Sequence, residues 1–169
     1  PEFAGMLLLS VFPLLFSLYL SFCEWNLVGG LRAIRFVGLA NYKEMFRDDV
    51  FYIALTNNLV FSFVAVPVGL AVALVLAVII HGFVYFKSFF KIALFIPYIS
   101  TTVAVAAVWR ALFYPSKGPV NEILRDLGVE NPPKWLADPE FALLAIIIIA
   151  VWANIGYKIV IYLAGLSQI

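Results

Sequence analysis

Four long, mainly apolar stretches divide this chain of 169 residues. They cover about residues 3–23, 50–80, 92–113 and 141–163. A hydrocarbon layer ~30 Å thick is crossed by ~20 residues of α-helix, so each stretch is long enough to span a membrane. Pro13, near the middle of the first stretch, is expected to kink its helix. The pattern predicts an all-α integral membrane protein, a polytopic bundle of which four spans are present.

The polar segments between these stretches form loops on alternating sides of the membrane. Residues 24–49 and 114–140 therefore lie on one side, and the short loop 81–91 lies on the other. The two large loops carry more Lys and Arg than the short one, and the positive-inside rule alone would place them in the cytoplasm. The Lys and Arg count by itself therefore predicts that residues 24–49 and 114–140 face the cytoplasm.

Short-range signals predict where several helices begin and end. Asn41 followed by Glu44 resembles a capping box for a short surface helix. Pro119 suits the first position of a helix and Gly128 suits its stop. The run Asp138–Glu140 supplies an N-cap, a first-turn proline and a first-turn acid for the last span.

Composition supports the membrane assignment and excludes several kinds of site. The chain is 64% hydrophobic and 12% charged, with a mean hydropathy of +1.04, whereas soluble domains carry about 25% charged residues. Its net charge of +1 is too small to indicate an acidic partner. Nucleic acid is not among the partners that we expect. One histidine and the single Cys23 exclude the usual zinc sites. The phosphate-binding motif GxxxxGK[ST] is absent, so we expect no enzyme activity and no cofactor in this chain.

Polar and aromatic residues inside the spans are the candidates for function, because each costs free energy in lipid. Trp152, Asn154 and Tyr157 lie on the last span and together offer flat faces and hydrogen-bonding groups, which suit a sugar ring or another polar solute. Thr101 and Thr102 lie on the third span. The alternatives are ordinary helix packing for the first group and hydrogen bonds to their own helix for the two threonines.

Two cations also lie within the predicted spans. Arg110 and Lys158 are each expected to reach toward the nearer membrane interface with their long side chains. An ion-coupled secondary carrier would need acidic residues within the membrane, and no predicted span contains Asp or Glu. A membrane scaffold without a solute path is the other alternative, and it would require Asn154, Tyr157 and Thr102 to face lipid or to be buried in packing.

Five phrases along nearly the whole chain form a pattern when taken together. They are FVGLANYKEMF (36–46), ALTNNLVFS (54–62), FKIALFIPYISTTVAVAAVWRALFYPSKGPVN (90–121), WLADPEFAL (135–143) and VWANIGYKIVIYLAGLSQI (151–169). In sequence and in order, these phrases resemble the permease subunits of binding-protein-dependent ABC importers for sugars, of the maltose and glycerol-phosphate transporter type.

The resemblance implies a multi-pass subunit of a bacterial or archaeal cell (inner) membrane that forms the translocation pathway of an ATP-driven importer. Two permease subunits, usually different chains, would form the path. Two ATPase subunits would bind ATP and magnesium, and an extracellular or periplasmic binding protein would deliver the solute. The resemblance places loops 24–49 and 114–140 outside and loop 81–91 in the cytoplasm, against the charge count.

The resemblance also implies a place for the solute. Solute contacts in the family lie on the helices that match the third and fourth spans, which points to Tyr157, Asn154 and Thr102. The family's cytoplasmic coupling loop, with its Glu-Ala-Ala motif, is expected beyond Ile169, and the residues that dock on the ATPase would lie there. Sugars, oligosaccharides and glycerol phosphates are all carried by proteins with these phrases, so the solute itself stays open.

Overall fold

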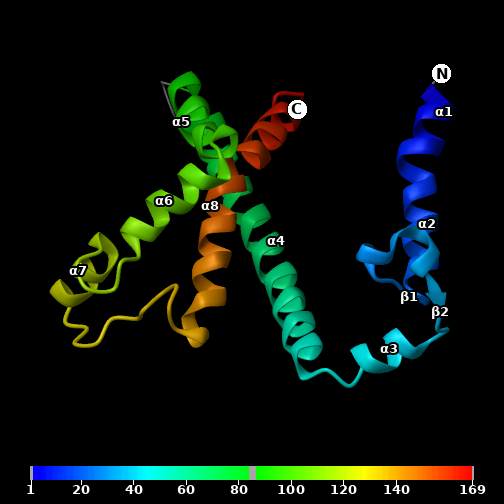
Figure 1. Ribbon diagram of the computed structural model, residues 1–169. Helices are drawn as coiled ribbons and strands as arrows, with labels where there is room; N and C mark the ends of the chain where they lie inside the picture. The colour runs from blue at the N-terminus through cyan, green and yellow to red at the C-terminus, as the bar shows by residue number, and fades with distance from the viewer. Residues whose placement is uncertain (1, 84–86, 169) are drawn as a thin grey trace. The chain divides into compact units, whose positions relative to one another are not determined.

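The computed structural model describes residues 2–83 and 87–168, which form helices and one two-stranded sheet (Figure 1). The chain divides into two compact units, residues 1–56 and 57–169, and each is described by itself. Among the described residues, three helices are long and apolar enough to cross a membrane, and a bent helix pair provides up to one more crossing. The predicted class, an all-α polytopic membrane protein, is confirmed.

The first unit begins with a helical segment, Glu2–Leu20, that changes type along its length. Its parts are α1 (Glu2–Met6), the π-helical η1 (Leu7–Val11) and α2 (Phe12–Leu20). Pro13 has no N–H to donate to the preceding turn, and its ring crowds the carbonyl four residues earlier. The wider π-helical turn lies directly before this proline and accommodates it, as π-bulges do within longer helices.

The remainder of the first unit is held together by Asn41. Its elements are β1 (Cys23–Glu24), η2 (Leu27–Ala33), β2 (Arg35–Phe36) and α3 (Ala40–Met45), with β1 and β2 antiparallel. The Asn41 amide donates hydrogen bonds to the carbonyl oxygens of Ser21, at 3.0 Å, and Cys23, at 2.9 Å. The predicted capping box is therefore wrong: α3 begins at Ala40, and the Asn41 amide satisfies carbonyls that follow α2.

The helix α4 (Asp49–Phe83) spans the boundary of the two units, and its part from Asn57 belongs to the second. Asp48 caps its start, because Oδ1 accepts a hydrogen bond from the Val50 amide at 2.8 Å. Small residues recur every fourth position and are buried, so they form a ridge along one face of α4 that permits close packing. The ridge consists of Ala65, Gly69, Ala73 and Ala77.

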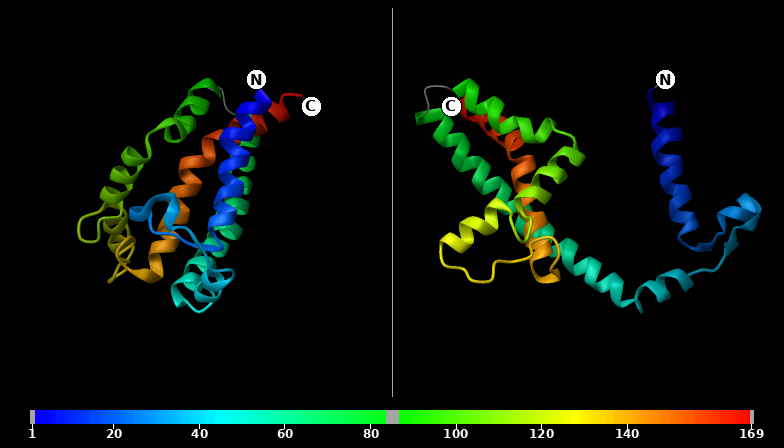
Figure 2. Two further views of the ribbon diagram at one scale, coloured as in Figure 1. Left: turned by 45° about the vertical axis from the view of Figure 1, so that its right-hand side comes forward. Right: turned by 60° about the vertical axis from the view of Figure 1, so that its left-hand side comes forward.

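The third predicted span, 92–113, is not one straight helix. It is divided into α5 (Lys87–Ile99) and α6 (Thr102–Leu112), and the two helices are bent by 100°. Figure 2 shows the change of direction between them. At the break, the Ser100 hydroxyl donates to the Ile96 carbonyl at 2.8 Å, and Thr101 Oγ1 accepts from the Ala104 amide at 3.3 Å. The Thr101 hydroxyl thus pairs an amide that an unbroken helix would have paired with the Ser100 carbonyl, and so it stabilises the break. The Ile96 carbonyl also accepts from the Ser100 N–H at 3.1 Å, so the Ser100 hydroxyl adds a second bond to a group that is already satisfied.

The loop between α6 and the last helix is built around one buried side chain. It contains α7 (Pro119–Asp126), which begins at the predicted proline, and Gly128 follows with a left-handed φ of 93°. Asn121 on α7 is fully buried. Its amide donates to the carbonyl oxygens of Pro115 and Pro133, each at 3.0 Å, and its Oδ1 accepts from Trp135 Nε1 at 2.7 Å. The two ends of the loop are thus joined through one residue.

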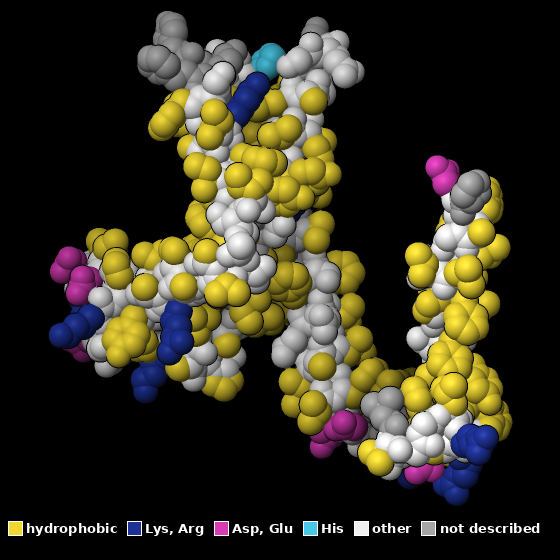
Figure 3. Space-filling view, turned by 45° about the horizontal axis from the view of Figure 1, so that its top comes forward, with side chains coloured by type: hydrophobic (Ala, Val, Ile, Leu, Met, Phe, Trp, Pro, Cys, Tyr) yellow, Lys and Arg dark blue, Asp and Glu magenta, His cyan; other side chains and the backbone are white. Residues whose placement is uncertain are grey.

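The last helix, α8 (Pro139–Leu166), packs against both α4 and α5 in the second unit. Asp138 caps it through the Glu140 amide at 3.1 Å, and Pro139 is its first residue, as predicted. The hydrophobic core lies between α4 and α8 and consists of Ala73, Ala77, Ile80, Ile155, Ile159 and Leu163. On the visible face, hydrophobic side chains cover the long helices, and most charged ones lie at helix ends and loops (Figure 3). This distribution suits a surface that faces lipid.

The contact between α8 and α5 brings their backbones together. A Cβ at Gly156 would collide with the carbonyl group of Leu94 and with the Cα of Phe95. Only glycine therefore fits at this crossing without displacing main chain. The close approach fixes the rotation of α8, and so it decides which side chains α8 presents to its surroundings.

Candidate functional site

One face of α8 is only partly covered by neighbouring helices, and it carries polar side chains midway along the helix. Asn154 and Tyr157 are exposed there, Tyr157 by 47%, and Lys158 is partly buried next to them. Residues three and four apart share a helix face, so both Tyr157 and Lys158 are neighbours of Asn154. Ile155 and Ile159, on another face, are buried in the core.

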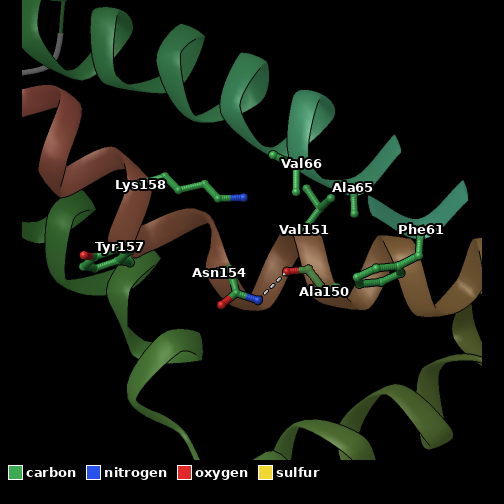
Figure 4. A pocket seen from close by; sticks show the side chains of 8 residues that line it. All are labelled: Phe61, Ala65, Val66, Ala150, Val151, Asn154, Tyr157 and Lys158. Atoms are coloured by element: carbon green, nitrogen blue, oxygen red, sulfur yellow. Dashed lines mark hydrogen bonds between the residues drawn. The ribbon is translucent and has the colours of Figure 1, made fainter. Parts of the chain in front are cut away.

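The first cavity lies between α4 and α8 and has a volume of about 230 Å³. Figure 4 shows its lining, with apolar side chains toward one end and the three polar residues of α8 toward the other. Its lining residues are Phe61, Ala65, Val66, Ala150, Val151, Asn154, Tyr157 and Lys158. A cavity that is largely apolar, with a few placed polar groups, has the general character of a small-molecule site.

The second cavity lies between α8 and the broken pair α5 and α6, and its volume is about 320 Å³. Tyr98 and Ser100 from the end of α5 and Thr102 from the start of α6 line it, together with Asn154. Asn154 therefore borders both cavities. The helix break at residues 100–101 opens directly onto the second one.

Asn154 keeps free hydrogen-bonding capacity. Its Nδ2 donates to the Ala150 carbonyl of its own helix at 2.8 Å (Figure 4). Within the described part of the chain, that is the one hydrogen bond this side chain makes. One amide N–H and the carbonyl oxygen Oδ1 are thus available to a molecule in either cavity.

Tyr157 forms an aromatic pair with a residue that sequence reasoning did not single out. Its ring stacks on that of Tyr98, with centroids 5.1 Å apart and an interplanar angle of 16°. Tyr98 is 43% exposed, so the pair presents ring surface and hydroxyl groups to its surroundings. Tyr98 lies within the phrase FIPY, but its partnership with Tyr157 depends on the packing of α5 against α8 and has no local signal.

The other predicted site residues lie elsewhere. Trp152 lines neither described cavity and packs edge-on against Trp109 of α6, with centroids 5.5 Å apart. Thr101 caps α6 through its hydroxyl, while Thr102 borders the second cavity. The structure thus places Thr102 and Asn154 at the second cavity and Asn154 and Tyr157 at the first, whereas Thr101 caps α6 and Trp152 packs against Trp109.

Lys158 also departs from the expectation that its side chain reaches toward the near membrane interface. A Cβ at Gly69 of α4 would collide with its Nζ, so the ammonium lies against the middle of α4. Gly69 has no side chain, and that absence makes the space for it. Among the described residues, no cluster of three or more His, Cys, Asp or Glu side chains that could hold a metal ion is found.

Relatives with known names match the chain along most of its length. A probable ABC transporter permease protein of Pyrococcus horikoshii is 35% identical over 159 residues, which are 94% of this chain and 54% of that protein. The lactose transport system permease protein LacF of Rhizobium radiobacter is 32% identical over 171 residues, covering 100% of this chain and 56% of LacF. The chain spans about half the length of these curated relatives.

A further permease relative and a solved structure also match the chain along most of its length. The arabinooligosaccharides transport system permease protein AraP of Bacillus subtilis is 33% identical over 138 residues, which are 80% of this chain and 44% of AraP. A chain in the crystal structure of a bacterial ABC transporter involved in the import of the acidic polysaccharide alginate superposes with a TM-score of 0.80. It is 22% identical, and the match covers 100% of this chain and 56% of that one.

No family model matches the chain. The similarity to named relatives nevertheless runs over nearly all of its residues, and the solved structure has the same fold over the same length. The helices described above supply the membrane-spanning segments that such proteins require. The chain belongs to the ABC transporter permease family.

Proposed function

We propose that this segment forms part of the wall of a solute pathway in an ATP-driven importer of sugars or related polar solutes. In this proposal the two cavities around α8 belong to the pathway. Asn154 and Tyr157 contact the solute, with Thr102 and Tyr98 beside them. The segment contributes the path and binds no cofactor.

The observation that carries the proposal is the break between α5 and α6. A helix of 13 residues and one of 11 residues measure about 20 Å and 16 Å at ~1.5 Å per residue, so neither crosses a ~30 Å hydrocarbon layer alone. In this proposal the bent pair counts as one crossing, and the break then lies at membrane depth. Irregular backbone is tolerated there only where it is buried in protein or lines a water-filled cavity. Ser100, Thr101 and Thr102 are exposed, which favours water over lipid at this point.

The choice of a sugar-like solute rests on the side chains around Asn154. The stacked Tyr98 and Tyr157 rings offer flat surface, and their hydroxyls and the Asn154 amide offer both donors and acceptors. A sugar ring can stack on the flat surface, and its hydroxyl groups can both donate to and accept from these side chains. The names of the relatives, which include permeases for lactose and arabinooligosaccharides, support the same class.

The partners follow from the family. ATP hydrolysis would take place in two ATPase subunits, with ATP and magnesium bound there. A second permease subunit would complete the path, and an external binding protein would deliver the solute to the outer loops. A structure of the alginate transporter that includes its periplasmic protein has the same fold as this chain, with a TM-score of 0.80. In a bacterium or archaeon, the assembly would lie in the cell (inner) membrane and work by alternating access.

The test is uptake by the complete transporter carrying Asn154→Ala or Tyr157→Ala. Loss of one hydrogen bond of about 1 kcal/mol corresponds to roughly a fivefold loss of uptake, and we expect at least this for Asn154→Ala. Tyr157→Phe keeps the ring and should fall between the parent and Tyr157→Ala. Ile161→Ala is the matched control, because Ile161 is 52% exposed on the same helix and lines neither described cavity. Unchanged uptake for both alanine variants, at parental expression, would contradict the assignment.

A further inference from the structure

Lys158 places a positive charge within the membrane segment of the second unit. It is on α8, and its ammonium reaches α4 at Gly69, in the groove that the first cavity occupies (Figure 4). The side chain is partly buried. The ridge of small, buried residues on α4 continues on either side of Gly69, and the ammonium lies against this ridge.

No acid of the described chain neutralises this charge. The helices that surround the groove, α4 from Asn57, α5, α6 and the part of α8 after Glu140, contain no Asp or Glu in their sequence. Among the described residues, Lys158 has neither an ion-pair partner nor a hydrogen-bond acceptor. Charged groups in a membrane interior usually face a water-filled cavity or pair with an opposite charge. Any counter-charge must therefore come from outside this segment.

We propose that Lys158 is a specificity-determining residue that binds an anionic group of the transported solute, either a carboxylate or a phosphate. This inference rests on the proposed function and narrows its substrate class from sugars to acidic or phosphorylated sugars. The ammonium borders the same cavity as Asn154 and Tyr157. A solute whose hydroxyls contact Asn154 and Tyr157 can place an acidic group against Lys158, where a hydrogen bond between charged groups is strongest.

The experiment measures the electrostatic potential of the cavity in the complete transporter, reconstituted in lipid. A cysteine replaces Asn154 in a background without other cysteines, and its reaction rates with an anionic and a cationic methanethiosulfonate reagent are compared. We expect Lys158→Gln to lower the ratio of anionic to cationic rates by about tenfold, because a charge a few ångströms away acts on both reagents in opposite senses. Lys158→Arg should keep the ratio, and Arg110→Gln, on α6, should leave it unchanged.

The outcomes separate this inference from the proposed function. In one outcome the cysteine reacts, but the ratio of anionic to cationic rates is the same with Lys158 and with Lys158→Gln. The proposed pathway then stands, and an acid elsewhere in the assembly already neutralises the charge. This outcome overturns the inference. If the cysteine at position 154 does not react with either reagent, the water-filled pathway itself is wrong and both proposals fall.

Protection of the cysteine identifies the anionic group. Glucuronate and glucose 6-phosphate are added as probes, with neutral glucose as the reference. We expect at least one of the two anionic probes to slow labelling more than glucose does, and the preference to disappear in Lys158→Gln. The probe that protects distinguishes a carboxylate from a phosphate. Equal protection by all three sugars, or a preference that survives Lys158→Gln, would overturn the inference.

Discussion

Replacing Asn121 by alanine should open the loop between α6 and α8 while the helices remain folded. The Asn121 side chain is fully buried and makes three hydrogen bonds that join Pro115, Pro133 and Trp135. Alanine can make none of them. Arg125 also donates to the Pro115 carbonyl, at 3.0 Å, so that oxygen keeps a partner in the variant.

The expected magnitude follows from the groups that lose their partners. The Pro133 carbonyl and the Trp135 indole N–H, both in partly buried residues, would be left without this partner. An unsatisfied buried group costs about 1–3 kcal/mol, and the lower half of that range applies to each of these two. We expect the free energy of opening the loop to fall by about 3 kcal/mol, which corresponds to a factor of roughly 150 in the open population. The stacking of Phe113 on Trp135, at 4.9 Å between centroids, should weaken with it.

Hydrogen exchange followed by mass spectrometry, on the complete protein in lipid nanodiscs, measures this opening. Peptides over residues 115–135 should exchange much faster in Asn121→Ala, while peptides within α8 should be unchanged. Asn131→Ala is the matched control, since Asn131 lies in the same loop and is exposed. Parental exchange rates over residues 115–135 in Asn121→Ala would refute the view that this side chain holds the loop together.

Two further substitutions test the helix contacts of the second unit. Gly156→Leu should prevent α8 from packing on α5, because even a Cβ collides with the Leu94 carbonyl. The fraction of monodisperse protein after detergent extraction should therefore fall severely. Gly165→Ala is the control and should behave like the parent, because a Cβ at Gly165 meets nothing within 4 Å. Thr101→Val removes the hydroxyl that accepts the Ala104 N–H at the start of α6, and it should lower the free energy of unfolding by about 0.5–2 kcal/mol. The melting temperature should fall accordingly, and an unchanged value would show that the cap contributes nothing.

The sequence predicted those features whose signals are local. The start of α8 at Asp138–Pro139 and the start of α7 at Pro119 depend on residues within one helical turn, and both are confirmed. The membrane class depends only on the length and hydrophobicity of the stretches. Each of these features requires no knowledge of which helix packs against which.

Features that depend on packing could not be predicted. The stacking of Tyr98 on Tyr157 requires α5 to cross α8 at Gly156. The position of Lys158 requires Gly69, in another helix, to leave space for it. The break at Ser100–Thr101 lay inside an apolar stretch that reads as one span, and the two hydroxyls beside it could equally bond within an unbroken helix.

The crossing of α8 and α5 at Gly156 has a mechanical consequence. Two helices that touch main chain to main chain cannot slide along each other without lifting apart, since no flexible side chain lies between them to adjust. This pair is therefore expected to move as one rigid unit. Relative movement of helices is therefore expected at the adjoining break, Ser100–Thr101, where α6 leaves α5 and the helical hydrogen bonds are interrupted. Under the proposed function, stiffening that break should slow transport while solute binding is unaffected.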